Sequence, residues 1–555
     1  MNESIGLNTL ALHTVGSAAL VLALTKAKAR LELSFAKHRS LAGHPRTARR
    51  VAALLPSYRY DEEQAFAVDG APLDVVARRK AAFAMLVQRC AERYPQSLAA
   101  SAAAAEGLSD LQFVSAYRVP FQFRALAAKG LKVASFVQSS AGVTVTDLDG
   151  NTFFDLTGSY GVNLLGNDFY KQCMDDGIAM VRDLGPVLGA YHPVMLDNLH
   201  RIKRISGMDE VSFHMSGTEA VMQAVRLARY HTGRKKLVRF CGSYHGWWGD
   251  VQPGIGNPMP AKDTLNLTEM GEATLHVLRT RKDIACILIN PLQALHPNAA
   301  APSDGSLLDS SRKAHFDRAA YTAWLQELRS ICDARGIALI FDEVFMGFRL
   351  AKGGAQDYFG VRADLVTYGK TLGGGLPIGV VCGKRGWMRR FRDESPADIC
   401  FARGTFNSHP YVMGAMNVFL RHLECDDMAL LYQSLDATWN RRAAQLNTRL
   451  SEAGIPVQVA HMSSVWTVLY TQPASYNWLF QHYLRFEGVA LSWVGTGRII
   501  WSLNFTDIDF EEVVQRFLRA GYAMKADGWW WSDGVSTNKS IKRRLLREML
   551  AVKFK

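Results

Sequence analysis

The 555-residue sequence predicts an α/β protein with a mainly parallel sheet flanked by helices, a smaller α+β domain and a helical N-terminal extension. After about residue 205, short apolar runs alternate with helical segments, as the strands of a parallel sheet buried on both faces do. Two later runs alternate apolar and polar residues, which is typical of half-buried strands. With 48% hydrophobic and 21% charged residues, the composition excludes intrinsic disorder and indicates at least two globular units.

The first 130 residues are expected to form the helical extension. Residues 71–108 are rich in strong helix formers and are interrupted only at Pro95. Residues 131–205 would contribute the N-terminal part of the small domain and a lead-in to the sheet. There, two short alternating runs flank Asp149-Gly150, which predicts a hairpin.

Residues 206–400 are predicted to form the large domain and residues 401–530 the C-terminal small domain. The expected strands of the large domain are VSFHM, KKLVRF, IACILIN, GIALIFDEV, DLVTYGK and IGVVCGK. Helices are expected from Phe406 to about Ala453, followed by strands at SSVWTVLYT and GRIIWSLNF.

Residues 531–555 are predicted to form a basic amphipathic tail, with a helix from Ser540 to Phe554. Its apolar side would hold Ile541, Leu545, Leu546, Met549 and Val552, and its basic residues would be Lys542, Arg543, Arg544 and Arg547.

The formal net charge of +13 belongs to the two ends of the chain. Residues 1–50 contain eight basic and two acidic residues, which gives this end a net charge of +6. Residues 539–555 contain seven basic residues and one acidic residue, again a net charge of +6, so the body of the chain carries only +1. A neutral body argues against a nucleic-acid partner. The basic ends instead suggest peripheral contact with an anionic membrane. The apolar stretch of residues 7–24 is diluted by polar residues, so a packed or surface-lying helix is expected there rather than a membrane span.

The eight cysteines are scattered singly and form no C-x-x-C pair. This usage is typical of reduced thiols, so we expect a cytoplasmic protein. No metal site is expected.

Three segments carry candidate chemistry, and the first is Ser216-Gly217-Thr218 between a strand and a helix. Its backbone N–H groups, its two hydroxyls and the helix dipole suit a phosphate. An ordinary N-cap at Ser216 or Thr218 is the alternative.

The other two segments present a carboxylate and a lysine. Asp342 ends a buried strand and needs a partner, which could be the protonated ring nitrogen of a cofactor, a structural arginine or backbone donors. Lys370 lies between a strand and the flexible run Gly373–Gly375. Burial there would imply a shifted pKa or a covalent bond, whereas the alternative is a solvated lysine beside a turn.

Together these segments supply a phosphate cup, a carboxylate and a lysine, the three protein groups that pyridoxal-phosphate chemistry requires. The stretches MSGTEAVMQAVRLAR, GSYHG, GTFNSHP and the block from FDEV to GKTLGGGLPIG resemble class III, fold type I pyridoxal-phosphate aminotransferases. The likeness is strongest to the glutamate-1-semialdehyde 2,1-aminomutase branch and covers about residues 135–525. The resemblance implies pyridoxal 5'-phosphate as the cofactor. It also implies that Lys370 forms the Schiff base and moves a proton, while Asp342 keeps the ring nitrogen protonated.

The resemblance also implies the surroundings of the cofactor. Gly217 and Thr218 would hold the phosphate, while Ser216 shapes the turn. Tyr244 and Val344 would lie on opposite ring faces. His245 could contact the cofactor or be a buried structural histidine. Thr405 would reach the phosphate of the neighbouring subunit, which implies a homodimer with shared active sites.

Substrate contacts are expected from Arg403, Arg349 and Ser159. Either arginine could bind a substrate carboxylate bidentately, although a structural salt bridge is the expected role of Arg349. Asn290 stands where many family members have a glutamate, and a hydrophobic residue such as Phe345 is typical of the aminomutase branch.

The expected activity is amino transfer between a small-molecule amine and a carbonyl acceptor. Intramolecular aminomutase activity is the alternative. A third hypothesis is a non-catalytic membrane-surface scaffold, based on the basic ends and on Trp529-Trp530-Trp531.

Overall fold

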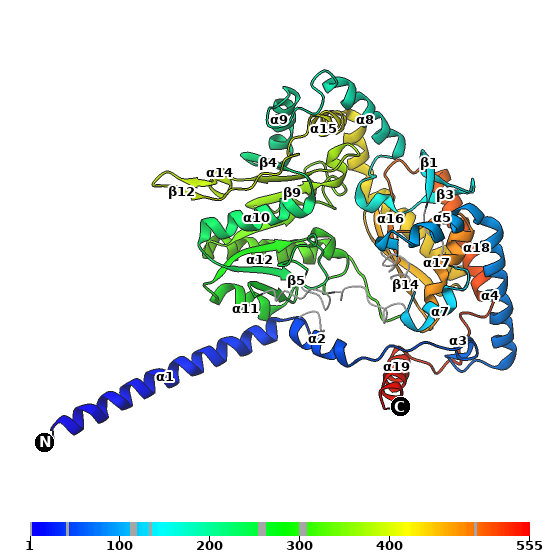
Figure 1. Cartoon of the computed structure of the whole chain (residues 1–555), viewed down its shortest axis with the longest axis horizontal. Helices are drawn as coiled ribbons and strands as arrows, with labels where there is room; N and C mark the ends of the chain where they lie inside the picture. Colours follow the sequence, from blue (N-terminus) through cyan, green and yellow to red (C-terminus); the bar gives the residue numbers. More distant parts are fainter. Residues whose placement is uncertain are drawn as a thin grey trace.

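The computed structural model describes residues 3–39, 44–111, 119–131, 136–252, 262–298, 308–492 and 497–554, with no side chains described for 3–17, 45 and 46. Its centre is a seven-stranded sheet in the order β4-β10-β9-β8-β7-β5-β6 (Figure 1). These strands are β4 Glu210–His214, β5 Lys236–Phe240, β6 Thr264–Leu267, β7 Ile284–Ile289, β8 Ala338–Asp342, β9 Leu365–Gly369 and β10 Gly379–Gly383. All neighbours are parallel except that β10 runs antiparallel to β4 and β9. The mainly parallel sheet and all six predicted strands are confirmed, and β6 adds an edge strand that was not predicted.

Helices cover both faces of this sheet. In β8, Ala338 and Ile340 pack in the apolar cluster that contains helix α10 (Gly217–Thr232). Leu339 and Phe341 alternate with them and pack in the cluster that contains α12 (Arg318–Arg335). Burial on both sides explains why the strands read as nearly continuous apolar runs. Three further helices belong to this part of the chain: α11 Glu272–Thr280, α13 Gly354–Phe359 and α14 Arg385–Met388.

Two smaller sheets lie beside the large one, in the orders β1-β2-β3-β15 and β13-β14-β16. Their strands are β1 Val137–Ala141, β2 Thr144–Asp147, β3 Thr152–Asp155, β13 Val457–Met462, β14 Val465–Tyr470, β15 Val489–Ala490 and β16 Arg498–Ile500. The antiparallel pair β2 and β3 confirms the hairpin predicted at Asp149-Gly150. The strands predicted at SSVWTVLYT and GRIIWSLNF are confirmed as β14 and β16. The helices of this region are α16 Asp426–Glu452, α17 Phe480–Phe486 and α18 Asp507–Ala526. A separate hairpin pairs β11 Phe391–Arg392 with β12 Ser395–Ile399.

Glycines allow helix α15 (Pro410–His422) to pack tightly against its neighbours. A Cβ atom on Gly177 of α8 (Asn167–Val181) would lie 2.2 Å from the backbone nitrogen of Ala415. A Cβ atom on Gly374 would lie 2.4 Å from the carbonyl oxygen of Ala415. The prediction that Gly373–Gly375 is flexible is therefore wrong, because the run forms a turn packed against α15. Helix α9 (Val194–Ser206) completes this group.

The N-terminal extension is helical, as predicted. Its helices are α1 Glu3–Ala36, α2 Pro45–Leu54, α3 Gln64–Ala67, α4 Leu73–Arg93, α5 Pro95–Ala105 and α7 Arg124–Ala127. Helix α1 projects away from the body (Figure 1). Its last turn meets the large sheet, where the Thr268 N–H donates to the Ala36 carbonyl over 2.8 Å. Within the described residues, no helix has the length and apolar character of a membrane span.

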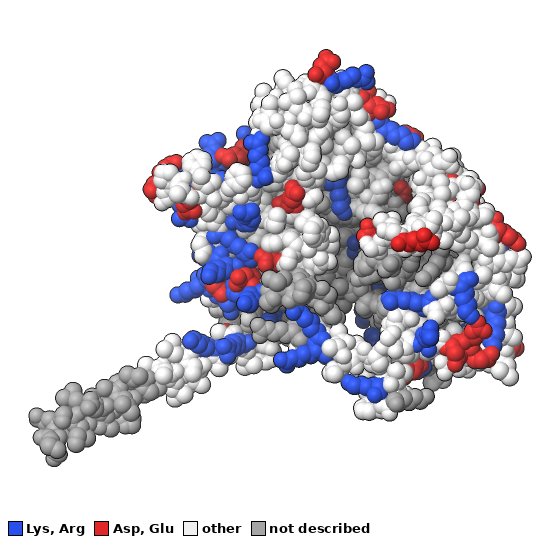
Figure 2. Space-filling model, viewed as in Figure 1, with Lys and Arg blue, Asp and Glu red and all other residues white. Residues whose placement is uncertain are grey.

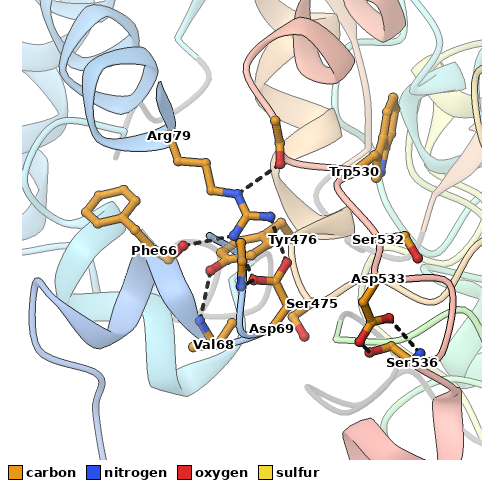
Figure 3. A network of polar contacts seen from close by, with 12 residues as sticks. Phe66, Val68, Asp69, Arg79, Ser475, Tyr476, Trp530, Ser532, Asp533 and Ser536 are labelled. Carbon is orange, nitrogen blue, oxygen red and sulfur yellow. Dashed lines mark hydrogen bonds and ion pairs between the residues drawn. The ribbon is translucent and has the colours of Figure 1, made fainter. Parts of the chain in front are cut away.

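The extension is held to the small domain by Arg79, whose side chain is fully buried (Figure 3). Its guanidinium donates to both carboxylate oxygens of Asp69 over 2.8 and 2.7 Å and to the carbonyls of Phe66 and Gly528. The group also lies 4.5 Å from the centre of the Tyr476 ring. The Arg79 guanidinium therefore joins α4 to the chain segments that precede α17 and follow α18.

Replacing Arg79 with methionine will lower the free energy of unfolding by about 3–5 kcal/mol, because the change leaves Asp69 without its buried counter-charge. Chemical denaturation checks this value. Arg78→Met is the matched control, since Arg78 is exposed and lies 3.8 Å from Asp74; its effect should stay below about 1 kcal/mol. Equal losses in the two variants would contradict the prediction.

The C-terminal tail forms helix α19 (Asn538–Lys553) and docks on the body. Arg544 donates to the Val68 carbonyl and, over 2.8 Å, to the Ser475 hydroxyl. Glu548 accepts hydrogen bonds from Tyr58 and Tyr60 over 2.8 and 2.7 Å. The helix is confirmed, and the predicted division of its faces is wrong in part. Ile541 and Leu545 are buried and Met549 packs against the core, as predicted, whereas Leu546 and Val552 are exposed and Arg544 is turned toward the body.

The tryptophan cluster also differs from the membrane-facing arrangement that the scaffold hypothesis required. Trp529 and Trp530 are buried, and their indole N–H groups donate to the Tyr483 hydroxyl and to Asn477 Oδ1. These two side chains therefore belong to the core. On the face shown in Figure 2, basic and acidic side chains are interspersed over the body, and basic ones gather where α1 joins it.

Candidate active site

The carboxyl ends of two adjacent strands bring the predicted carboxylate and lysine to one edge of the large sheet. Strand β8 ends at Asp342 and pairs in parallel with β9, where Asp342 is opposite Thr367. Lys370 follows the last residue of β9 and opens the short helix η6 (Lys370–Gly373). Its φ of 49° is in the left-handed region, which turns the chain sharply out of the strand.

Asp342 is buried and is held by three hydrogen bonds. The Thr367 hydroxyl and the Val344 N–H each donate to Oδ1 over 3.2 Å, and Nδ1 of His245 lies 2.7 Å from Oδ2. Burial lowers the pKa of His245 although Asp342 opposes the shift, so the ring is neutral. A carboxylate only accepts hydrogen bonds, so Nδ1 carries the ring proton. His245 therefore fixes the carboxylate without neutralising it.

The Lys370 amine lies in an environment that disfavours its charged form. Nζ donates to the Tyr160 carbonyl over 2.5 Å and lies 4.6 Å from the centre of the Phe345 ring. Burial lowers the pKa of Lys370 to about 8. The positive charges of Arg349 and Arg498 also lower this pKa, and together they outweigh the negative charge of Asp342, which raises it. A neutral amine, the nucleophilic form, is therefore available near physiological pH.

The Ser216-Gly217-Thr218 turn lies directly against Val344, two residues after Asp342. Ser216 is the N-cap of α10 and accepts from the Glu219 N–H over 3.3 Å, which confirms the capping interpretation for Ser216. A Cβ atom on Gly217 would lie 2.5 Å from Cγ1 of Val344. Only glycine permits this approach, so the start of α10 and its free N–H groups face the same sheet edge.

Tyr244 is brought to this edge by the loop that follows β5, and Gly246 of the same loop packs against Thr218 of α10. A Cβ atom on Gly246 would lie 2.5 Å from Oγ1 of Thr218, and Gly246 adopts a φ of +90°. Tyr244 is exposed, and its carbonyl accepts from Asn290 Nδ2 over 3.0 Å. Asn290 therefore positions the loop from Tyr244 to Gly246.

Three further predicted site residues lie on exposed segments, and their predicted roles stay predictions. Ser159 is exposed in the turn η3 (Gly158–Gly161) and has a φ of 44°. Arg403 and Thr405 are exposed on the segment before α15, and no contact recorded among the described residues joins either of them to Lys370 or Asp342.

Within the described residues, no carboxylate forms the salt bridge predicted for Arg349. Its guanidinium is fully buried and donates to the carbonyls of Trp501 and Asn163 over 3.0 and 2.9 Å and to the Ser464 hydroxyl over 3.3 Å. Two backbone carbonyls and one hydroxyl accept from its Nη1 and Nη2, while its Nε is buried without a hydrogen-bond partner in the described parts of the chain. With these bonds in place, Arg349 joins the residue after β16 and the segment before α8 to the large domain, and its predicted contact with a substrate stays a prediction.

The residues present fit pyridoxal phosphate. Burial lowers the pKa of the Lys370 amine to about 8, and the carboxylate of Asp342 is buried and held by His245, Val344 and Thr367. The start of α10 is kept open by the absence of side chains at Gly217 and Gly246. These are an attachment point, a partner for a ring nitrogen and a cradle for a phosphate.

Sequence reasoning missed Thr367 and the Tyr160 carbonyl. Thr367 is a polar residue in the apolar strand LVTYG, and this irregularity could have indicated its role. The Tyr160 carbonyl left no signal, because backbone groups contribute regardless of the side chain and Tyr160 is far from Lys370 in sequence.

The comparisons with known proteins agree with this geometry. Residues 125–520 match the aminotransferase class-III family. Over 305 residues, the chain is 35% identical to a glutamate-1-semialdehyde 2,1-aminomutase from Alkaliphilus oremlandii, covering 52% of this chain and 66% of the relative. The corresponding protein of Geotalea daltonii is 30% identical over 360 residues, covering 62% and 78%.

Solved structures share the fold. A transaminase with pyridoxal phosphate bound is 27% identical and superposes with a TM-score of 0.60, covering 71% of this chain and 92% of its own. A glutamate-1-semialdehyde aminomutase from Pseudomonas aeruginosa is 19% identical with a TM-score of 0.64, covering 81% and 99%. The latter likeness concerns the fold alone.

Proposed function

The chain belongs to the class-III aminotransferase family of pyridoxal-phosphate enzymes, and from this premise we propose that it transfers an amino group between an amine donor and a carbonyl acceptor, with Lys370 as the attachment point. The observation that carries the proposal is the meeting of the Lys370 amine and the buried Asp342 carboxylate at one sheet edge. A screen of amino donors against keto-acid and aldehyde acceptors, with products identified by mass spectrometry, tests it. Absence of amino transfer with every pair would contradict it.

Bound pyridoxal phosphate supplies an electron sink for the bond broken at the substrate Cα. Asp342, fixed by His245 and Thr367, keeps a proton on the facing ring nitrogen, because a buried carboxylate favours a positive partner. The N–H groups at the start of α10 and the Thr218 hydroxyl bind the phosphate. The Lys370 amine, about half of which is neutral at pH 8, would accept the proton from the substrate Cα.

Attachment of cofactor to the apoenzyme will speed up as pH rises and level off just above pH 8. The neutral amine reacts, and the pKa of Lys370 is lowered to about 8. Below this pH the amine becomes protonated and the rate falls tenfold per pH unit. Stopped-flow absorbance measures the rate. A rate that still climbs at pH 10 would show an ordinary lysine.

Aminomutase activity is the second candidate. It is supported by the names of the two relatives above and by Phe345, whose ring lies against the Lys370 amine. One amino aldehyde substrate given without a second donor or acceptor separates the alternatives. Continued turnover indicates a mutase, whereas a reaction that stops after one equivalent indicates a transaminase.

A homodimer with shared active sites is part of the proposal. It is supported by the exposure of Thr405 and of the neighbouring Phe401 and Phe406 rings, which a second copy would cover. Light scattering after gel filtration will give the mass of two chains. In the dimer, Thr405→Ala will weaken cofactor affinity, whereas a monomeric enzyme with unchanged activity would contradict shared sites.

Peripheral contact with an anionic membrane is proposed for α1, in a protein whose mostly buried cysteine thiols support a cytoplasmic location. The helix exposes Leu20, Leu24 and Leu31 among basic residues. The tail supports this less, because α19 docks on the body. Sedimentation with vesicles containing phosphatidylserine will retain the protein at low salt and release it at high salt. Equal binding to phosphatidylcholine vesicles would contradict the electrostatic contact.

A further inference from the structure

A buried arginine lies on the same face of the large sheet as Asp342. Arg239 of β5 is aligned with Leu288 of β7, which in turn is aligned with Ile340 of β8. Leu288 and Ile340 pack in the apolar cluster that contains α10, so Arg239 faces α10 as well. Asp342 is two residues beyond Ile340 and points to this face because side chains alternate along a strand. Only β7 separates the arginine from the strand that carries the carboxylate.

Arg239 holds the loop that follows β5 and carries His245. Its Nη2 donates to the Ser243 carbonyl and, over 3.3 Å, to the Ser243 hydroxyl. From the segment after β7, Nε2 of Gln293 donates to the Cys241 carbonyl over 2.9 Å. The loop is therefore fixed at two points shortly before His245.

The charge of Arg239 has no counter-ion in the described parts of the chain. Burial lowers the pKa of Arg239 to about 10, so the group is still charged at neutral pH, and no carboxylate among the described residues opposes this shift. Its Nε is also buried without a hydrogen-bond partner there. A buried charge of this kind is costly, which indicates that its position beside the His245 loop has a function.

The two nitrogens of the His245 ring have different surroundings. Nδ1 donates to Asp342 Oδ2 over 2.7 Å, whereas Nε2 is buried and has no hydrogen-bond partner in the part of the chain that the structure describes. A second proton on the ring would have to be on Nε2, where no described acceptor would receive it. Burial and the positive charge of Arg239 both lower the pKa of His245, while Asp342 raises it.

These two charged groups reach the ring from different elements. Asp342 comes from β8 and Arg239 from β5. The other elements packed against the loop contribute side chains that do not titrate, namely Asn290 and Gln293 after β7 and Thr218 of α10. The charge of the ring therefore depends on the balance between Asp342 and Arg239 within a buried site.

We propose that Arg239 is a positioning residue for amino transfer, which anchors the His245 loop and keeps the ring a neutral donor to Asp342. The inference rests on the proposed function, in which Asp342 holds the ring nitrogen of the cofactor. A charged His245 would pair with Asp342 and compete with that nitrogen for the carboxylate. Arg239 acts through His245 and not by contact with the reacting atoms.

Nuclear magnetic resonance of the full-length protein with 15N-labelled histidine reports the charge of His245 without turnover. The signal that is missing from His245→Gln identifies the residue. Between about pH 8 and about pH 5.5, a range that brackets the ordinary titration of histidine, the wild-type ring will stay neutral with its proton on Nδ1. In Arg239→Gln, which keeps a donor for Ser243 but loses the charge, the ring will become charged over the same range. A wild-type ring that is charged at neutral pH, or an Arg239→Gln ring that stays neutral throughout, would overturn the proposal.

The rate of the holoenzyme shows whether this charge matters for amino transfer. The donor is the one that the amino-donor screen identifies, and the ratio of Arg239→Gln to wild-type kcat cancels the titration of Lys370 that both proteins share. We expect this ratio to fall about 10-fold between about pH 8.5 and about pH 5.5, with little change in KM, because the charged form of the ring comes to dominate. In the His245→Gln background, Arg239→Gln will have the same effect at both pH values. A loss that does not depend on pH while His245 is present would show a merely structural arginine and overturn the proposal.

Three further variants separate charge from packing. Arg239→Lys keeps a positive charge on β5 and will restore the pH dependence of the wild type. Arg239→Met is a second neutral variant in case Arg239→Gln does not fold. Arg442→Met is the matched control, because Arg442 is 5% exposed and Arg239 6%, but Arg442 is bound to Asp507 in the small domain. Its loss will leave the His245 signal and the pH dependence of kcat unchanged, and an effect equal to that of Arg239→Gln would contradict a specific role of Arg239.

Failure of this inference can be told from failure of the proposed function. The magnetic resonance experiment can be run on the apoenzyme and requires no amino transfer. If the wild-type protein transfers no amino group, the proposed function fails, whereas the spectra still test the link between Arg239 and His245. If amino transfer proceeds but the charge of His245 does not depend on Arg239, only the present inference fails.

Discussion

Lys370→Ala will abolish amino transfer and leave a protein that holds no covalently attached cofactor. The variant loses the attachment point and also the base that accepts the Cα proton, and loss of proton transfer alone lowers kcat by about 10²- to 10⁴-fold. Borohydride reduction followed by peptide mass spectrometry will find the cofactor on the Lys370 peptide of the wild type and on no peptide of the variant. Purified wild-type protein should be yellow and the variant colourless.

Lys352→Ala is the control for this prediction. Lys352 is an exposed lysine of the same domain, so its loss should change neither colour nor rate. Thermal melting without cofactor should show both variants folded. A Lys370→Ala protein that remains yellow after dialysis and retains activity would show that another amine is the attachment point.

Asp342→Asn will lower kcat by about 10²- to 10³-fold, the cost of removing one preorganised electrostatic group from an active site. The amide is nearly isosteric and can still accept from His245 and Thr367, but it carries no charge to keep the facing ring nitrogen protonated. The absorption spectrum of the bound cofactor, recorded against pH, will show this change together with the rate.

The neighbouring Glu343 provides a matched control. It is also buried, its Oε2 accepts from the Ala355 N–H over 2.6 Å, and burial raises its pKa to about 8. Because Glu343 is mostly protonated at neutral pH, Glu343→Gln changes shape and charge little and should preserve kcat. A comparable loss in both variants would mean that packing at the end of β8, rather than the charge of Asp342, controls the rate.

The large domain could be predicted from the sequence because its strands are buried on both faces and read as apolar runs. The same logic placed Asp342 and Lys370 at strand ends, where parallel neighbours bring them together. The edge strand β6 escaped prediction because TLNL is short and contains Asn266 in an otherwise apolar run. The hairpin at Asp149-Gly150 was predictable because turn chemistry is local.

The parts that could not be predicted depend on contacts between distant segments. A buried Arg349 that donates to backbone carbonyls has the same sequence signature as one in a salt bridge, since backbone acceptors leave no trace in the side-chain pattern. From sequence alone, Trp529 and Trp530 could equally face a membrane or a core, because their burial depends on contacts with α4 and α17, which lie far away in the chain.

The contact between Glu548 and the pair Tyr58 and Tyr60 has a consequence for the order of folding. These residues are 488 to 490 positions apart in the chain, and both ends of the protein must be ordered before the hydrogen bonds can form. Because large proteins fold by units and distant closures come late, the body should fold first and the two ends should lock together last. During synthesis on the ribosome, Tyr58 and Tyr60 therefore cannot bind Glu548 until helix α19 has been synthesised and has emerged.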